Sequence, residues 1–343
     1  MKTKFIFVAP QIPYGGAERQ MLEVKNNFPR EVVLIDLTKN ISIDDTGSQQ
    51  KMNISGPGLK RRINRYFCLI QLYKEYRKNK KDIFVFYNSI FLSLGYFLKI
   101  SGCNVYFSIR ENNSDFYTKK AQFFLKKLDG VFTNTPSVFY ELKKRNLKAG
   151  LFLNTVDTKL PQNDPNTFNQ RDPNKIFMVS NVEPHKQVLE VIKGLNKEHY
   201  EILIAGTTEN NRSYYNLCQQ EAKNSNCEVK FLGSIQKEEI INYYKTCGCF
   251  LHPSLVEGTS NAIIDAIKYD IPLIVGNTSE NRYLVDDLSD FIWEDGSLPK
   301  KIENVLKHSK DMQYQDKMEY LRRRLNLKFS ARNTHNIINF ISS

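Results

Sequence analysis

Short runs of apolar residues recur along the chain and alternate with longer stretches whose apolar residues return every three or four positions. The runs are rich in Val, Ile, Leu and Phe, which indicates buried strands, and the stretches between them have the spacing of amphipathic helices. We expect strands at 5–9, 32–37, 83–87, 105–109, 131–133, 176–180, 202–205, 229–232, 250–252 and 273–275. This alternation predicts an α/β fold with doubly wound parallel sheets.

A polar, proline-bearing segment between Asp157 and Lys175 interrupts this pattern, and its composition is typical of a linker. We therefore expect an N-terminal Rossmann-like domain over 1–157, a linker over 158–175 and a C-terminal Rossmann-like domain over 176–327. Helical spacing returns at about 328–343 and predicts a helix that packs back across either domain, with the N-terminal one as our expectation. The length of 343 residues suits two such domains.

Amino-acid composition limits the classes of binding partner and the cellular compartment that we expect. Lys and Arg number 49 against 37 Asp and Glu, so the net charge of +12 attracts nucleotide phosphates, anionic lipids or nucleic acid without choosing among them. The six cysteines form no CxxC pair and are interpreted as reduced core thiols. The N-terminus has no cleavage-site pattern, and the apolar region 83–100 contains polar interruptions. We expect a cytoplasmic protein without a membrane span.

The segment from Leu251 to Ile267 has the strongest chemical signal. A strand ends near Pro253, and Thr259 or Ser260 can cap the helix that follows. Free amides at the start of that helix, with Gly258 allowing close approach, would hold a diphosphate, and the carboxylates of Glu257 and Asp265 would flank the ligand. The alternative is a helix N-terminus with incidental acids.

Two further segments follow predicted strands and so face the crevice of an open α/β sheet. Asn181 and Lys186 follow the first strand of the C-terminal domain. Gly15 and Gly16 follow the first strand of the chain, where glycines permit a sharp turn close to a phosphate or sugar. For Lys186 the alternative is a solvated surface lysine.

Two weaker candidates concern the second substrate. Arg110, Glu111 and Asn112 follow the strand at 105–109 and are predicted to contact an acceptor. Residues 59–81 predict a basic amphipathic helix that docks on an anionic membrane surface. The alternative for this helix, weighted equally, is packing on the sheet with its charges in solvent.

Several motifs of other functions are missing. No DxD pair follows a strand, and the chain has no Walker A, HExxH or GxSxG sequence. The five histidines are scattered. We therefore expect no metal and no cofactor, and no nucleic-acid motif accompanies the positive charge.

The acid spacing resembles a known family. Pro-Ser-x-x-Glu-Gly with a second acid eight residues later is similar to the Glu-x7-Glu hallmark of glycosyltransferase family 4, retaining enzymes of the GT-B fold, in which two Rossmann-like domains face a central cleft. The resemblance implies that Glu257 lies beside the donor sugar, that Asp265 holds the ribose, and that Lys186 neutralises the donor diphosphate. The chain departs from the pattern with Asp at 265 and with Asn181 where the family has arginine.

The resemblance implies two sets of site residues. Glu257 and Lys186 are the catalytic candidates. The donor-binding set consists of Gly15, Gly16, Asn181, Lys186, Glu257, Gly258, Thr259, Ser260, Asn261 and Asp265.

The function expected from this resemblance is retaining transfer of a hexose from a nucleotide sugar to a glycan or lipid-linked acceptor, in cell-surface polysaccharide or glycoconjugate synthesis. A UDP-sugar is favoured over a GDP-sugar. We expect a cytoplasmic protein that can be peripheral on the inner face of the plasma membrane. The alternatives are a nucleotide-sugar epimerase of the same fold and a non-enzymatic membrane or nucleic-acid adaptor.

Overall fold

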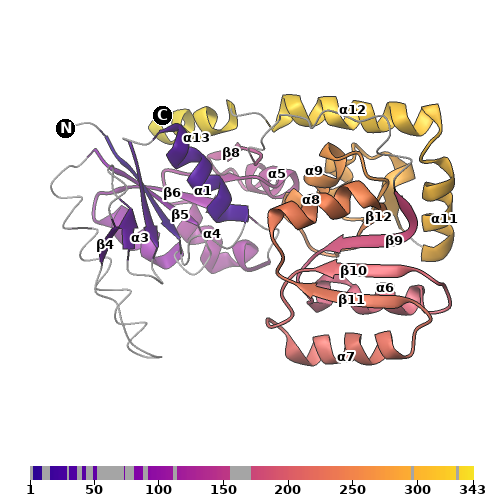
Figure 1. Cartoon of the computed structure of the whole chain (residues 1–343). Helices are drawn as coiled ribbons and strands as arrows, with labels where there is room; N and C mark the ends of the chain where they lie inside the picture. The colour runs from indigo at the N-terminus through magenta and orange to yellow at the C-terminus, as the bar shows by residue number, and fades with distance from the viewer. Residues whose placement is uncertain are drawn as a thin grey trace. The chain divides into compact units, whose positions relative to one another are not determined.

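A computed structural model of the chain describes residues 3–9, 16–28, 31–36, 41–43, 49–51, 73, 81–87, 92–110, 114–154, 171–294, 297–329 and 332–343. The chain forms two compact units (Figure 1). The first contains Met1–Val156 and Phe329–Ser343, and the second contains Asp157–Lys328. The chain therefore returns to the first unit for its last residues.

The first unit is built on an eight-stranded sheet with the order β4-β3-β2-β1-β5-β6-β7-β8. β3 and β4 pair antiparallel at one edge, and the other neighbours pair parallel. The strands are β1 (Phe5–Ala9), β2 (Val32–Asp36), β3 (Ile41–Ile43), β4 (Gln49–Lys51), β5 (Ile83–Tyr87), β6 (Asn104–Ile109), β7 (Gly130–Thr133) and β8 (Ala149–Leu151).

Alternate residues of these strands enter two hydrophobic clusters, because successive side chains of a strand point to opposite faces. One cluster contains Ile6 and Val8 and packs against α3 (Leu92–Ile100), α4 (Lys119–Leu125) and α5 (Pro136–Lys144). The other contains Phe5 and Phe7 and packs against α1 (Gly16–Asn27) and α13 (Arg332–Ser342). The C-terminal helix thus completes the core of the first unit.

The second unit has a six-stranded, all-parallel sheet with the order β11-β10-β9-β12-β13-β14. Its strands are β9 (Asp172–Val179), β10 (Glu201–Ala205), β11 (Glu228–Gly233), β12 (Cys247–His252), β13 (Leu273–Gly276) and β14 (Ile292–Trp293). Chain order runs outward in both directions from β9, which places a topological switch point between β9 and β12. Ligands of doubly wound sheets bind at the carboxyl ends of the strands at such a point.

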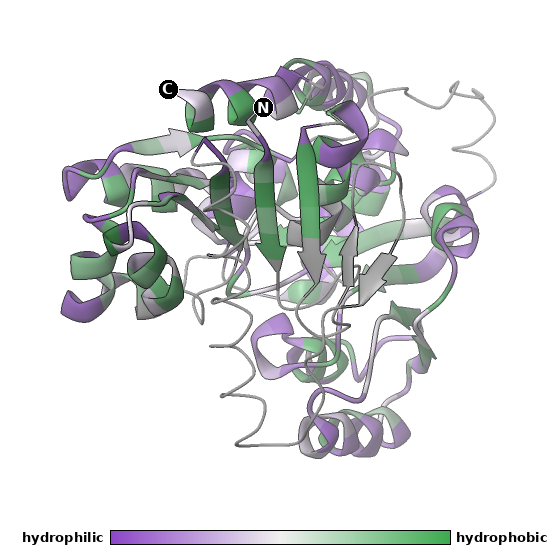
Figure 2. Ribbon diagram, turned by 90° about the vertical axis from the view of Figure 1, so that its left-hand side faces the viewer, coloured by the Kyte–Doolittle hydropathy of each residue, from purple (hydrophilic) through white to green (hydrophobic). Residues whose placement is uncertain are grey.

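Helices connect the parallel strands of the second unit. They are α6 (Val188–Gly194), α7 (Arg212–Lys223), α8 (Lys237–Thr246), α9 (Asn261–Lys268) and α10 (Ser279–Leu284). Two more helices, α11 (Leu298–His308) and α12 (Met312–Lys328), follow the last strand. The 3-10 turn η2 (Ser114–Tyr117) belongs to the first unit, and η4 (Pro184–Lys186) and η5 (Ser289–Phe291) belong to the second. Figure 2 shows green, apolar strands and helices that carry both colours, as expected for amphipathic covers of a sheet.

All ten expected strands are present, which confirms the doubly wound α/β fold. The bounds differ at one important place, because β9 begins at Asp172 and so the last residues of the expected linker 158–175 belong to the sheet. Residues 158–170 lie outside the described part of the chain. The sequence reading missed the short strands β3, β4, β8 and β14 and the helix α12.

Two expectations from composition can be compared with the described residues. The five described cysteines, Cys103, Cys218, Cys227, Cys247 and Cys249, are buried and form no disulfide. None of the described helices combines the length and the apolar character that crossing a bilayer requires.

Candidate functional site

Lys186 lies at the end of a short connection between β9 and α6. The 3-10 turn η4 holds Pro184, His185 and Lys186, and the Lys186 amide donates to the carbonyl of Glu183 over 2.9 Å. Gln187 then adopts a left-handed conformation with φ of 57°, which ends the turn and starts α6. The lysine is thereby fixed at the carboxyl end of the central strand β9.

Glu257 lies in the loop that joins β12 to α9. Ser260 caps α9 by accepting a hydrogen bond from the Ile263 amide over 3.4 Å. The loop is tied to the η4 turn because the Leu255 amide donates to the carbonyl of His185 over 2.9 Å. This backbone contact brings the loops after β9 and β12 together across the switch point.

The two catalytic candidates meet there. Lys186 Nζ donates to Glu257 Oε1 over 2.5 Å, and His252 Nε2 lies 2.8 Å from the same oxygen. Burial raises the pKa of the Glu257 carboxyl, but the charge and hydrogen bond of His252 and those of Lys186 outweigh it and hold that pKa well below its ordinary value. Glu257 is therefore a carboxylate at neutral pH.

Lys186 retains N–H donors that can bind a ligand. Its ammonium group has three N–H donors, and among the described residues Glu257 is its one partner. The side chain is 17% exposed, so a charge here is only partly screened by water. Two donors at the end of a parallel strand, close to the start of α9, form a suitable site for an anion.

His252 is a site residue that the sequence analysis did not single out, since it treated the five histidines only as scattered. It is the last residue of β12 and 3% exposed, and its Nε2 lies 3.3 Å from Ser260 Oγ as well as close to Glu257. It thus connects the Glu257 carboxylate to the cap of α9. Its position immediately before Pro253, at the carboxyl end of a buried strand, was the available signal.

Asn181 extends the site toward β10. Its Oδ1 accepts from the Thr207 amide over 3.2 Å, which leaves its Nδ2 without a partner among the described residues and able to donate to a ligand. Gly206 permits this close approach, because its φ is 155° and a Cβ there would lie 2.1 Å from the carbonyl oxygen of Ser180. The sequence reading did not identify Gly206 or Thr207.

The remaining donor candidates of this unit surround the α9 N-terminus. Gly258 and Thr259 are partly exposed in the loop, and Asn261 is the first residue of α9. Asp265 lies one turn further along, partly buried. Because the helix begins only at Asn261, Glu257 lies in the loop and only Asp265 belongs to the helix.

Fewer candidates of the first unit belong to the described residues. Gly16 is the first residue of α1, whereas Gly15, Glu111 and Asn112 lie outside the described residues. The Arg110 guanidinium donates to Asn154 Oδ1, which links the end of β6 to the turn after β8.

Only Tyr73 and Lys81 of the basic segment 59–81 are described. Tyr73 is partly buried and packs against the core cluster of α3 and α4. That single contact agrees with the alternative in which this segment packs on its own domain.

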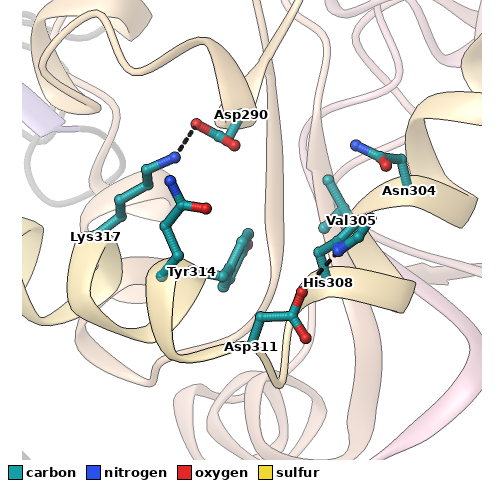
Figure 3. A pocket seen from close by; sticks show the side chains of 8 residues that line it. Asp290, Asn304, Val305, His308, Asp311, Tyr314 and Lys317 are labelled. Atoms are coloured by element: carbon teal, nitrogen blue, oxygen red, sulfur yellow. Dashed lines mark hydrogen bonds and ion pairs between the residues drawn. The ribbon is translucent and has the colours of Figure 1, made fainter.

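A separate cavity of about 270 Å³ opens in the second unit, lined by Asp290, Asn304, Val305, His308, Asp311, Gln313, Tyr314 and Lys317 (Figure 3). Two ion pairs border it, Lys317 with Asp290 and His308 with Asp311, both at 2.7 Å. It contains none of the donor candidates. In the described part of the chain no three His, Cys, Asp or Glu side chains are grouped to hold a metal.

Comparisons with known proteins agree with this arrangement. The profile of the family "Glycosyl transferases group 1" matches residues 161–322, which include every donor candidate of the second unit. No curated protein matches the sequence.

Solved structures share the fold over nearly the whole chain. HepE from Anabaena, solved with UDP-glucose, has a TM-score of 0.77 at 13% identity and covers 99% of this chain and 100% of its own. Sucrose-phosphate synthase from Thermosynechococcus elongatus has a TM-score of 0.79 at 12% identity and covers 98% of both chains. A glycosyltransferase from Rickettsia africae has a TM-score of 0.75 at 14% identity and covers 99% of this chain and 98% of its own. Residues 161–322 therefore resemble the group 1 glycosyl transferase family, and the chain has the GT-B fold of these solved structures.

Proposed function

We propose that the protein transfers a hexose from a nucleotide sugar to a glycan or lipid-linked acceptor, with retention of anomeric configuration, in the synthesis of cell-surface polysaccharide or glycoconjugate. The observation that supports this most is the convergence of Lys186, Glu257 and the N-terminus of α9 at the switch point of the second sheet. This site offers cationic and amide donors to a diphosphate and a carboxylate to a sugar hydroxyl.

The expected chemistry needs stabilisation of a leaving diphosphate. Lys186 retains two N–H donors, and the first-turn amides of α9 add positive potential, so both would stabilise charge that grows as the glycosidic bond breaks. In retaining members of this fold a front-face substitution is favoured, with the leaving phosphate accepting the proton of the acceptor. We therefore assign no side-chain base, no metal and no cofactor.

A UDP-sugar remains our choice of donor, and the structure of HepE with UDP-glucose supports a uridine nucleotide on this fold. We propose that the acceptor contacts the first unit near Arg110. We also propose that the protein is located at the inner face of the plasma membrane.

Lys186→Ala tests the site directly. The loss of a charged donor to the leaving group is expected to lower kcat by about 10²–10³. The rate is measured as acceptor-independent hydrolysis of a panel of UDP- and GDP-sugars. Saturable binding of the same nucleotide sugars is measured separately. Glu257→Ala is expected to remove transfer with little change in the far-UV circular dichroism. Lys197→Ala, an exposed lysine after α6, is the matched control and keeps activity.

Each alternative predicts its own result. An epimerase converts the donor without an acceptor, which sugar analysis of the recovered nucleotide sugar detects. An adaptor binds no nucleotide sugar. Full activity in both Lys186→Ala and Glu257→Ala would contradict the site assignment.

A further inference from the structure

Helices α3 and α4 of the first unit carry apolar side chains that are exposed to solvent. Phe97 and Ile100 of α3 are 51% and 61% exposed, and Phe123 of α4 is 51% exposed. The Tyr96 ring lies between the helices, 5.7 Å from Phe123 and 6.4 Å from Phe97 between centroids. These side chains therefore form one continuous patch rather than isolated exposed residues.

The patch consists of side chains that the core leaves exposed. Ala121 and Leu125 of α4 turn toward the core, as do Leu94 and Leu98 of α3. At 100° per residue, Phe123 lies about 160° to 200° from the buried positions of α4. Phe97, Ile100 and Phe123 remain more than half exposed.

Lysines surround the same patch. Lys119 and Lys120 precede Phe123, and Lys126 and Lys127 follow it. All four are exposed and none has an ion pair among the described residues. The helices α3 and α4 contain no acidic residue, and the nearby Asp129 is already paired with Lys99 at 2.6 Å. Among the described side chains of α3 and α4 the charge around the patch is therefore positive.

We propose that this aromatic–lysine surface, formed by Tyr96, Phe97, Ile100, Phe123 and the four lysines, docks the protein on a bilayer that contains anionic lipid. Aromatic and aliphatic side chains would enter the boundary between headgroups and acyl chains, and the lysines would contact the anionic headgroups. Charge complementarity favours this occupant over a neutral protein surface, and the exposed Ile100 and Phe97 favour it over nucleic acid.

The residues of this surface lie outside the basic segment 59–81 in the sequence, and the proposal does not depend on the transfer reaction. Each lysine near an anionic membrane contributes on the order of fivefold to partitioning. Loss of two lysines, and their replacement by acids, should therefore lower the partition coefficient by more than tenfold.

The test is flotation of the full-length protein with vesicles of phosphatidylcholine alone or with added phosphatidylglycerol. We expect binding only to the anionic vesicles, with a decrease at high salt. The double variants Phe97→Ser with Phe123→Ser, and Lys126→Glu with Lys127→Glu, should each lower binding at least tenfold while thermal unfolding is unchanged.

Matched controls change the same residue types elsewhere. Lys237→Glu with Lys307→Glu gives the same change in net charge, and Met312→Ser with Leu327→Ser removes apolar residues that are 81% and 82% exposed. Both controls should keep vesicle binding. Vesicle binding that survives in both test variants would overturn the proposal. The proposal would also be overturned if the protein did not bind vesicles but self-associated, and if the variant Phe97→Ser with Phe123→Ser abolished this self-association.

Discussion

Glu257 has two protein neighbours, Lys186 and His252, rather than the single ligand contact that its motif predicted. Lys186 and His252 reach the same carboxylate oxygen, at 2.5 and 2.8 Å, although they come from different loops. The oxygen Oε1 is thus occupied by the protein's own donors, and the geometry of the carboxylate is fixed before any substrate arrives. Preorganisation of this kind avoids reorganisation during the reaction. His252 acts here as a positioning residue.

Asp270 is a second carboxylate whose pKa is changed by its environment in the folded protein. Its side chain is 11% exposed, and burial raises its pKa from 3.8 to about 6, although Arg322 and Arg171 oppose the rise. The folded protein therefore holds a proton more readily than the unfolded chain between about pH 4 and pH 6. Stability from this group is lost as the pH rises through that window.

Asp270→Asn should remove this pH dependence. A pKa rise of this size corresponds to about 3 kcal/mol of unfolding free energy, so the variant should show a flatter stability profile between pH 4.5 and 6.5 in urea unfolding. Asp287→Asn is the control, because Asp287 has a similar φ of 58° but a side chain that is 68% exposed. An equally steep profile in Asp270→Asn would show that other groups cause the dependence.

At the scale of elements, the second unit places its site by strand order. β9 and β12 are neighbours in the sheet although α6 to α8 separate them in the chain, so the loops that follow them meet. The backbone contact from Leu255 to His185 and the approach of Gly206 to Ser180 hold these loops at fixed distances. The loops are therefore parts of one site, with little freedom to separate.

Gly206→Ala should damage this arrangement. A φ of 155° is rarely adopted by residues with a Cβ, and the added carbon would lie 2.1 Å from the Ser180 carbonyl oxygen and 2.8 Å from the Asn181 nitrogen. We expect a loss of at least about 2 kcal/mol in urea unfolding and weaker nucleotide-sugar binding, since Asn181 must move.

Gly194→Ala is the matched control for this substitution. Its Cβ would meet only Leu298 side-chain atoms at 3.7 and 3.8 Å, which is ordinary contact at the end of α6. Its stability and donor binding should be unchanged or slightly better. Similar losses in both variants would argue against a special role of the Gly206 backbone.

At the scale of the molecule, the chain crosses from the second unit back to the first at its end. Ile337 and Ile341 of α13 are fully buried in the core of the first unit, and the Phe340 ring contacts those of Tyr106 and Phe152 at 5.7 and 5.4 Å. The first unit is therefore complete only after the second has been synthesised. The single tryptophan, Trp293, belongs to the second unit.

Phe340→Ala should destabilise the first unit selectively. The ring is partly exposed, so we expect a loss of about 2 kcal/mol, below the ~3–5 kcal/mol of a fully buried Phe. In urea, far-UV circular dichroism should show an earlier transition while Trp293 fluorescence keeps its midpoint. Asn336→Ala, at an exposed position of the same helix, should change neither signal. A shift of the Trp293 midpoint alone would contradict the assignment of α13.

The sequence by itself determined the class of fold and supplied most of the candidates for the donor site. Ten strands were evident from local apolar runs, and Glu257, Lys186 and the cap at Ser260 were evident from residue type and spacing. These features are local, because a strand's pattern and a helix cap depend on residues within a few positions. The short strands β3, β4, β8 and β14 were missed because two to three residues carry no periodicity.

Only the tertiary structure decided which groups contact one another. His252 reaches Glu257 and Ser260, and Asn181 binds the Thr207 amide, because parallel pairing sets the strand ends side by side. The relation between Glu257 and Asp265 also depends on the fold, because the first lies in a loop and the second in α9. The exposed face of α3 and α4 also appears only in the fold, since an amphipathic pattern does not tell which apolar residues remain uncovered.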